Sequence, residues 1–175
     1  MLPLASATLT ESMQLTLFTD YALRMLMYLG LSGDDRLIPI QEVSEGCDVS
    51  HHYMLKVANE LTHLGWVKST RGRGGGVRLA IKPSDLTVGD LVRHTEPDRG
   101  VLDCVSSEDA DCPLVPSCQL REVLGEAEEE FYRVLDQYTL ADIIARKERL
   151  TPLLGLSRLT SNTVLRARGR ERIRP

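Results

Sequence analysis

The stretch "SHHYMLKVANELTHLGWVKSTRGRGGGVRLAI" at residues 50–81 decides the fold of this 175-residue chain. Ser50 is a good N-cap, and a helix from His51 that ends at Gly65 is expected to bury one apolar stripe. That stripe comprises Tyr53, Met54, Val57, Leu61 and Leu64. Beyond the helix, "WVKST" and "VRLAI" alternate like two short strands on either side of "RGRGGG". The pattern predicts a helix followed by a basic two-stranded hairpin.

Two further helices are predicted before this stretch. In "IPIQEVSEG", Pro39 suits a first turn, Ile40 and Val43 form an apolar pair, and Gly46 is expected to terminate a short helix. A first helix is predicted over residues 16–31, with Thr19 as its cap. A tight turn at residues 46–49 would then join two helices into a helix-turn-helix.

The glycine-rich segment has a competing interpretation as a phosphate-binding loop. Such loops open a helix, whereas the residues after Gly76 resemble a strand that ends at Pro83. The context therefore favours a basic wing.

Downstream of the wing, "TVGDLVRHTE" predicts a helix that stops before Pro97. Residues 119–138 then repeat apolar positions at spacings of four and three, namely Leu120, Leu124, Ala127, Phe131, Val134 and Tyr138. A rod of this length, about 30 Å, suits a dimerisation helix. The alternative is an amphipathic helix packed on its own domain, but helix-turn-helix proteins usually read two half-sites with two subunits. "YTLADIIAR" adds a short closing helix.

Charge is segregated along the chain, although the net charge is only −4. Residues 36–82 carry seven Lys or Arg against four acids, residues 83–145 carry four against fifteen, and the last 25 residues carry six against one. A basic segment beside an acidic one indicates an anion-binding face and a separate second task. The sequence has neither a membrane-spanning run nor the basic start of a signal peptide, so we expect a cytoplasmic protein.

The candidate DNA contacts lie at the start of the predicted recognition helix and at the tip of the wing. Basic groups there can reach base edges and phosphates in the major groove, and arginine suits a narrow minor groove. The competing interpretation is a solvated charged surface. The predicted contacts are Ser50, His51, His52, Lys56, Arg71 and Arg73.

Three of the four cysteines lie in one acidic stretch of 15 residues, at Cys104, Cys112 and Cys118. Zinc ribbons use paired C-x2-C ligands, so this spacing favours an iron–sulfur cluster, which a wider loop can hold. Three thiolates leave one position open to another ligand. Ordinary buried thiols are the alternative, which the polar surroundings disfavour. Cys47 stands alone in the predicted turn and is expected in the core.

Together "MQLTLFTDYALRMLMYL", "VSHHYMLKVANELTHLGWV", "RGRGGGVRL", the three cysteines and "LDQYTLADII" resemble NsrR-type repressors. These form the nitric-oxide-sensing branch of a bacterial winged-helix family that also contains IscR and RirA. The resemblance runs from Met13 to about Arg149. It implies a homodimer on promoter DNA and a cluster, [4Fe–4S] in preference to [2Fe–2S], bound by Cys104, Cys112, Cys118 and Asp20 of the partner subunit.

Two alternatives stay open. The gap between Cys104 and Cys112 and the segment "DCPLVPSC" also resemble the RirA branch, which would make iron or cluster availability the signal instead of nitric oxide. An electron-transfer protein is the third possibility, but such carriers normally hold a cluster with four thiolates. No nucleotide, flavin or general-base motif is visible, so we expect no enzyme.

These features predict a mainly α protein: a winged helix-turn-helix with a two-stranded wing and a long C-terminal dimerisation helix. The expected division is an N-terminal extension at 1–12, a DNA-binding domain at 13–82, a cluster loop with dimerisation helices at 83–149, and a basic disordered tail at 150–175.

Overall fold

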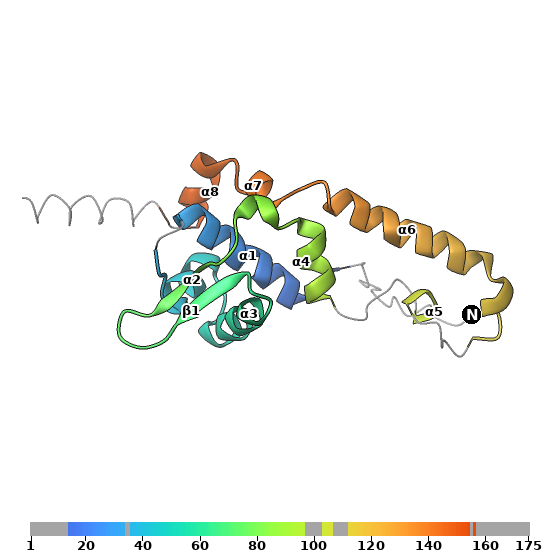
Figure 1. The fold of residues 1–175 in the computed structure, drawn as a ribbon, viewed down its shortest axis with the longest axis horizontal. Coiled ribbons are helices and arrows are strands. Elements are labelled where there is room, and N and C mark those ends of the chain that lie inside the picture. The colour runs from blue at the N-terminus through green and yellow to red at the C-terminus, as the bar shows by residue number, and fades with distance from the viewer. Residues whose placement is uncertain (1–13, 34–35, 97–102, 107–111, 155, 157–175) are drawn as a thin grey trace, which may run out of the picture.

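The computed structural model describes residues 14–33, 36–96, 103–106, 112–154 and 156, and it is mainly helical (Figure 1). Its α-helices are α1 (Leu17–Ser32), α2 (Ile40–Cys47), α3 (His51–His63), α4 (Val88–Thr95), α5 (Asp103–Ser106), α6 (Gln119–Leu135), α7 (Leu140–Ile143) and α8 (Lys147–Leu153). Two short 3-10 turns are η1 (Pro83–Asp85) and η2 (Val115–Ser117). The strands β1 (Val67–Thr70) and β2 (Gly76–Leu79) form one antiparallel hairpin. Within the described residues, no helix is both long and apolar enough to cross a membrane.

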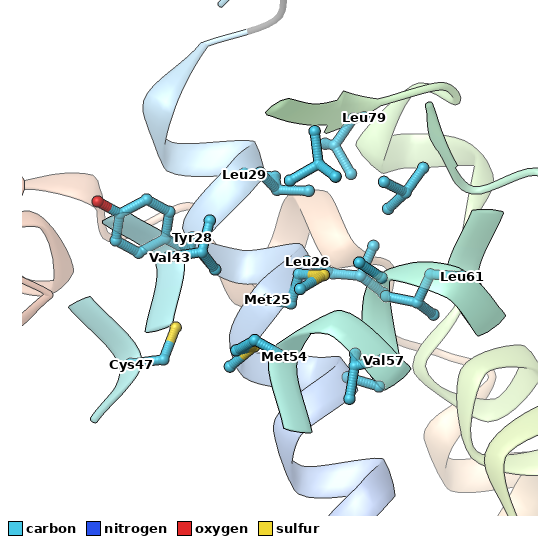
Figure 2. Close-up of a cluster of buried hydrophobic side chains, with 14 of the residues drawn as sticks. Met25, Leu26, Tyr28, Leu29, Val43, Cys47, Met54, Val57, Leu61 and Leu79 are labelled. Atoms are coloured by element: carbon cyan, nitrogen blue, oxygen red, sulfur yellow. The ribbon is translucent and has the colours of Figure 1, made fainter. Parts of the chain in front are cut away.

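The core forms where α1 packs against α2, α3 and the hairpin (Figure 2). Met25, Leu26 and Leu29 of α1 meet the apolar stripe of α3, which is Met54, Val57 and Leu61. Cys47 is buried in the same cluster, as predicted.

The helix-turn-helix forms as predicted, but its turn begins at Asp48, two residues later than expected. α2 runs through Gly46 to Cys47, and the left-handed residue that ends it is Asp48, at φ 53°. Gly46 is needed for packing instead, because a Cβ there would overlap the Tyr28 ring. Ser50 caps α3 as predicted, by accepting a hydrogen bond from the Tyr53 N–H.

The wing follows α3 and is tied back to the chain before α2. Val67 pairs with Leu79 and Thr70 with Gly76, while Ile38 and Val77 exchange hydrogen bonds of 2.9 and 2.8 Å. Gly76 permits this approach, since a Cβ there would lie 2.5 Å from the Ile38 carbonyl oxygen. The loop before α2 is therefore bonded to the wing, which lies beside α3.

The cap of α1 differs from the prediction. Thr16, not Thr19, is the N-cap, and Thr19 lies inside the helix with no exposed surface. Buried Glu96 explains the difference: its Oε1 accepts from the Thr16 N–H (2.5 Å) and from the hydroxyls of Thr16 (2.8 Å) and Thr19 (2.5 Å). A carboxylate at the start of a helix also complements the helix dipole. The end of α4 is thus fastened to the start of α1.

The hydrophobic core extends beyond residue 82, where a domain boundary was expected. Leu86, Leu91, Val92 and Leu140 are all buried in the cluster that contains the α1 and α3 residues. Thr87 and Thr139, which precede α4 and α7, form an isolated antiparallel bridge. Both helices therefore belong to the same packed unit as the helix-turn-helix.

α6 projects away from this unit, with its N-terminal end next to α5 (Figure 1). None of its residues is buried in the described chain, although Tyr132 and Leu135 at its C-terminal end touch the core. The helix stops at Leu135, so Tyr138 of the predicted apolar repeat lies beyond it. The Tyr138 carbonyl accepts a hydrogen bond from the Val88 N–H instead.

Ordered structure continues past the predicted start of the tail. α8 crosses residue 150, and Leu156 is only 4% exposed because it packs into the core. The predicted extension at 1–12 and the rest of the tail, 157–175, lie outside the described residues.

Candidate DNA-binding face and cysteine site

The start of α3 presents polar side chains on the molecular surface. Ser50, His51, His52 and Lys56 are all exposed, as the predicted contacts must be. Ser50 and His51 also line a hollow of about 350 Å³ over the helix-turn-helix turn, shared with Gln41, Ser44 and Glu45 of α2. Such a face can donate hydrogen bonds to phosphates and base edges.

Tyr53 was predicted in the buried stripe and is instead 52% exposed. Its ring lies edge-on to Tyr21 at 5.9 Å, and the Lys56 ammonium sits 5.5 Å from its centroid. Met54, Val57, Ala58 and Leu61 occupy the buried face, which leaves position 53 outside it. The positions of these four residues along the helix were the sequence signal that could have placed Tyr53 on the exposed side.

The wing tip carries Arg71 and Arg73, both exposed. They flank Gly72 at φ 95°, and Gly74 at φ 79° follows. Both conformations favour glycine, so the sharp turn that presents the two arginines depends on these residues. The geometry suits arginine entry into a groove.

The three clustered cysteines are all partly buried, and none forms a disulfide. Cys118 lies immediately before α6 and lines an open hollow of about 420 Å³. Val105, which follows Cys104 in α5, lines the same hollow and lies near Gly125 of α6. Cys112 is linked to the following turn, since its carbonyl accepts from the Val115 N–H. The structure therefore places the segments of Cys104 and Cys118 side by side on one face of α6.

Three free thiols fit an iron–sulfur cluster in ligand type and leave one position for a ligand of another kind. In the part of the chain that the structure describes, however, no group of three or more His, Cys, Asp or Glu side chains could hold a metal ion. Residues 107–111, which join Cys104 to Cys112, lie outside that part. The donor set fits in its chemistry, but the described protomer does not gather it.

Asp20 lies in the first turn of α1, on the surface. Its carboxylate pairs with Arg24 at 2.7 Å, and Arg24 also donates to the Cys47 carbonyl (3.3 Å) at the end of α2. The hydrogen bond to the Asp20 carboxylate raises the pKa of the Arg24 guanidinium. Asp20 is thus connected through one arginine to the helix-turn-helix, and any metal ligand role would compete with that ion pair.

A helix-turn-helix, a basic wing and a projecting helix together define a winged-helix DNA-binding regulator. The chain belongs to the Rrf2 family, because the model of that family, described as an iron-dependent transcriptional regulator, matches residues 15–146. It is therefore a transcriptional regulator and not an enzyme.

Several similar proteins share the name NsrR. The HTH-type transcriptional regulator NsrR of Geobacillus kaustophilus is 41% identical over 142 residues, which cover 81% of this chain and 97% of that protein. NsrR of Bacillus subtilis is 39% identical over 144 residues, covering 82% and 99%. Among solved structures, T. potens IscR superposes with a TM-score of 0.60 at 24% identity, covering 77% of this chain and 88% of that chain. The NsrR resemblance and the winged-helix prediction are confirmed.

Proposed function

We propose that this chain is a homodimeric repressor whose binding to promoter DNA depends on an iron–sulfur cluster, with nitric oxide as the signal that ends repression. Cys104, Cys112 and Cys118 would hold the cluster through their thiolates, and the partner subunit's Asp20 would supply an oxygen ligand. The [4Fe–4S] form is favoured over [2Fe–2S]. The proposed place of action is the cytoplasm, where promoter DNA is found.

The observation that carries this proposal is the presence of three free, partly buried thiols beside α6, in a chain about 40% identical to regulators named NsrR. A bound cluster supplies iron sites that react with nitric oxide. The chain's own contribution is to position the thiols at the end of α6 and the Asp20 carboxylate at the start of α1.

The apolar face of α6 supports the dimer. Leu120, Phe131 and Val134 of the predicted repeat are 60%, 37% and 48% exposed. α5 approaches α6 through Val105 beside Gly125, and these three stripe residues stay exposed within the described chain. A helix with an exposed apolar stripe at this spacing suits pairing with a second copy.

Single cysteine variants test the site. Protein purified without oxygen should contain iron and sulfide and show a cluster absorption band, whereas Cys104→Ala, Cys112→Ala and Cys118→Ala should lose both. Cys47→Ala is the matched control, because Cys47 is a core residue, and it should keep the band. An unchanged iron content in Cys112→Ala would rule out the proposed ligand set.

Nitric oxide and iron depletion separate the two candidate signals. DNA affinity of the cluster-loaded dimer should fall by roughly 5- to 150-fold after nitric oxide, the range of a typical coupling free energy. Loss of affinity only after iron chelation would favour the iron-responsive, RirA-like alternative, which the cysteine spacing motivates.

A further inference from the structure

One ion pair joins the packed unit to the projecting helix. Arg93 of α4 donates from Nη1 to Asp136 Oδ1 (2.8 Å) and from Nη2 to Oδ2 (2.6 Å), across 43 positions of sequence. The same guanidinium lies 4.6 Å from the centroid of the Tyr132 ring, while Asp90 lies 3.9 Å away. Two parallel bonds from a planar group restrict orientation as well as distance.

The backbone around this pair is adapted to it. Gly89 faces Asp136 so closely that a Cβ would collide with the carboxylate. Beside it, the Val88 N–H donates to the Tyr138 carbonyl and the Leu140 N–H donates to the Leu86 carbonyl, both at 2.8 Å. The chain after α6 is therefore attached to α4 at two points, a backbone bridge and the Arg93–Asp136 pair.

The pair contributes more to geometry than to stability. The Arg93 and Asp136 side chains are 41% and 40% exposed, and exposed ion pairs add little to folding free energy. Yet within the described residues Tyr132 and Leu135 are the only hydrophobic side chains of α6 that pack against the core, so few other contacts there determine the direction in which the helix projects.

We propose that Arg93 and Asp136 form a positioning pair that sets the separation of the two recognition helices on DNA. This inference rests on the proposed dimeric function, in which α6 joins the subunits. A 17-residue helix is about 25 Å long. Rotation by about 10° at its attached end moves the far end by about 4 Å, more than the rise of about 3.4 Å per base pair. Without the pair, the dimer would discriminate less between half-sites of different spacing.

The test measures spacing preference. The wild-type dimer first selects an inverted repeat from a pool of random duplexes. Kd is then measured for that duplex, for versions with the spacer one base pair longer or shorter, and for a single half-site. Arg93→Gln, Asp136→Asn and the double variant are compared with Glu130→Gln/Arg133→Gln, because that pair lies within α6 and joins no other element.

We expect the ratio of Kd values between altered and selected spacers to fall by up to about fivefold in the Arg93 and Asp136 variants, since an exposed ion pair rarely contributes more. Their half-site Kd should stay unchanged, and the double variant should be no worse than either single one. The control should keep the wild-type preference. If Arg93→Gln does not fold, Asp136→Asn carries the test alone.

An unchanged spacing preference in folded Arg93 and Asp136 variants, or an equal loss in the control, would overturn this inference and leave the proposed function unaffected. If the wild-type protein were a monomer or selected no repeated site, the proposed dimeric function itself would be wrong.

Discussion

At the residue scale, Gly46 and Gly125 are both helical glycines in opposite surroundings. A Cβ at Gly46 would overlap the Tyr28 ring and lie 3.0 Å from the Leu154 carbonyl oxygen, whereas at Gly125 the nearest atom is Val105 Cγ1 at 3.7 Å. Gly46→Ala should therefore lower the free energy of unfolding by about 1–3 kcal/mol through overpacking. Gly125→Ala should be neutral or raise it by about 0.5–1 kcal/mol, because alanine favours helix. Urea unfolding of both variants checks the pair, and equal effects would contradict the packing.

Cys47 should be alkylated more slowly in the folded protein than in the unfolded chain. Burial raises the pKa of this thiol from 9.0 to about 11, with Arg24 opposing the shift in part. Only the thiolate attacks an alkylating agent, so at pH 8 iodoacetamide should modify Cys47 about a hundredfold more slowly in the folded protein than in urea. Mass spectrometry of time points measures this rate. A folded-state rate equal to that in urea would mean that the thiol is accessible.

The same shift has a consequence for stability. Between pH 9 and about 11 the folded state keeps the Cys47 proton while the unfolded chain loses it. The contribution of Cys47 to stability therefore falls as pH rises through this window.

At the scale of elements, α8 should stabilise the packed unit although it lies outside the matched family region. Leu156 is 4% exposed and its N–H donates to the Thr151 carbonyl, whereas Leu153 is 79% exposed. Leu156→Ala should lower the free energy of unfolding by about 2 kcal/mol or more, since about 2 kcal/mol is the lower end of the range for a core leucine. Leu153→Ala should stay within about 0.5 kcal/mol. Equal unfolding midpoints for the two variants would show that α8 is not docked as described.

The wing should contribute to DNA affinity independently of the recognition helix. Arg71→Ala should weaken binding by about 1–3 kcal/mol if the side chain reads a groove, and each lost phosphate contact should lower the salt slope by about one. Arg133→Ala removes the same charge from α6, far along the chain from the wing, and should leave affinity near wild type. Fluorescence anisotropy at several salt concentrations measures both. Equal losses would indicate a general charge effect.

At the scale of the whole molecule, α6 should hold two copies together. Phe131→Glu places a charge on the exposed apolar stripe and should weaken the dimer by roughly 30-fold or more, as for an interface hot spot. Arg133→Gln alters a 63% exposed side chain of the same helix and should leave the dimer intact. Sedimentation equilibrium distinguishes the two. A Phe131→Glu protein that remained dimeric would place the interface elsewhere.

The elements that were predicted correctly are those whose signals are local. Ser50 caps α3, "RGRGGG" turns the wing, and the stretches "TVGDLVRHTE" and "YTLADIIAR" form α4 and α7, because caps, turns and helical spacing involve residues only a few positions apart. The spacing of Cys104, Cys112 and Cys118 and the exposed polar start of α3 were visible for the same reason. Periodicity indicated which residues a helix could bury, and the family resemblance followed from these motifs in order.

Other features depended on which distant segments meet. The apolar spacing of α3 was taken to include Tyr53, but in the fold α1 packs on the face of Met54 and Val57 and leaves Tyr53 exposed. Glu96 bonds Thr16 and Thr19 across 80 and 77 positions, and Arg93 reaches Asp136 across 43. Gly46 lies inside its helix because Tyr28 packs there, and Leu156 is ordered because the core accepts it. The sequence by itself determined the helices, the wing and the three thiols, since short-range hydrogen bonding and side-chain spacing encode them. The tertiary structure alone decided the contact of Glu96 with the start of α1, the direction of α6 and the burial of Leu156, because those depend on side chains brought together only by folding.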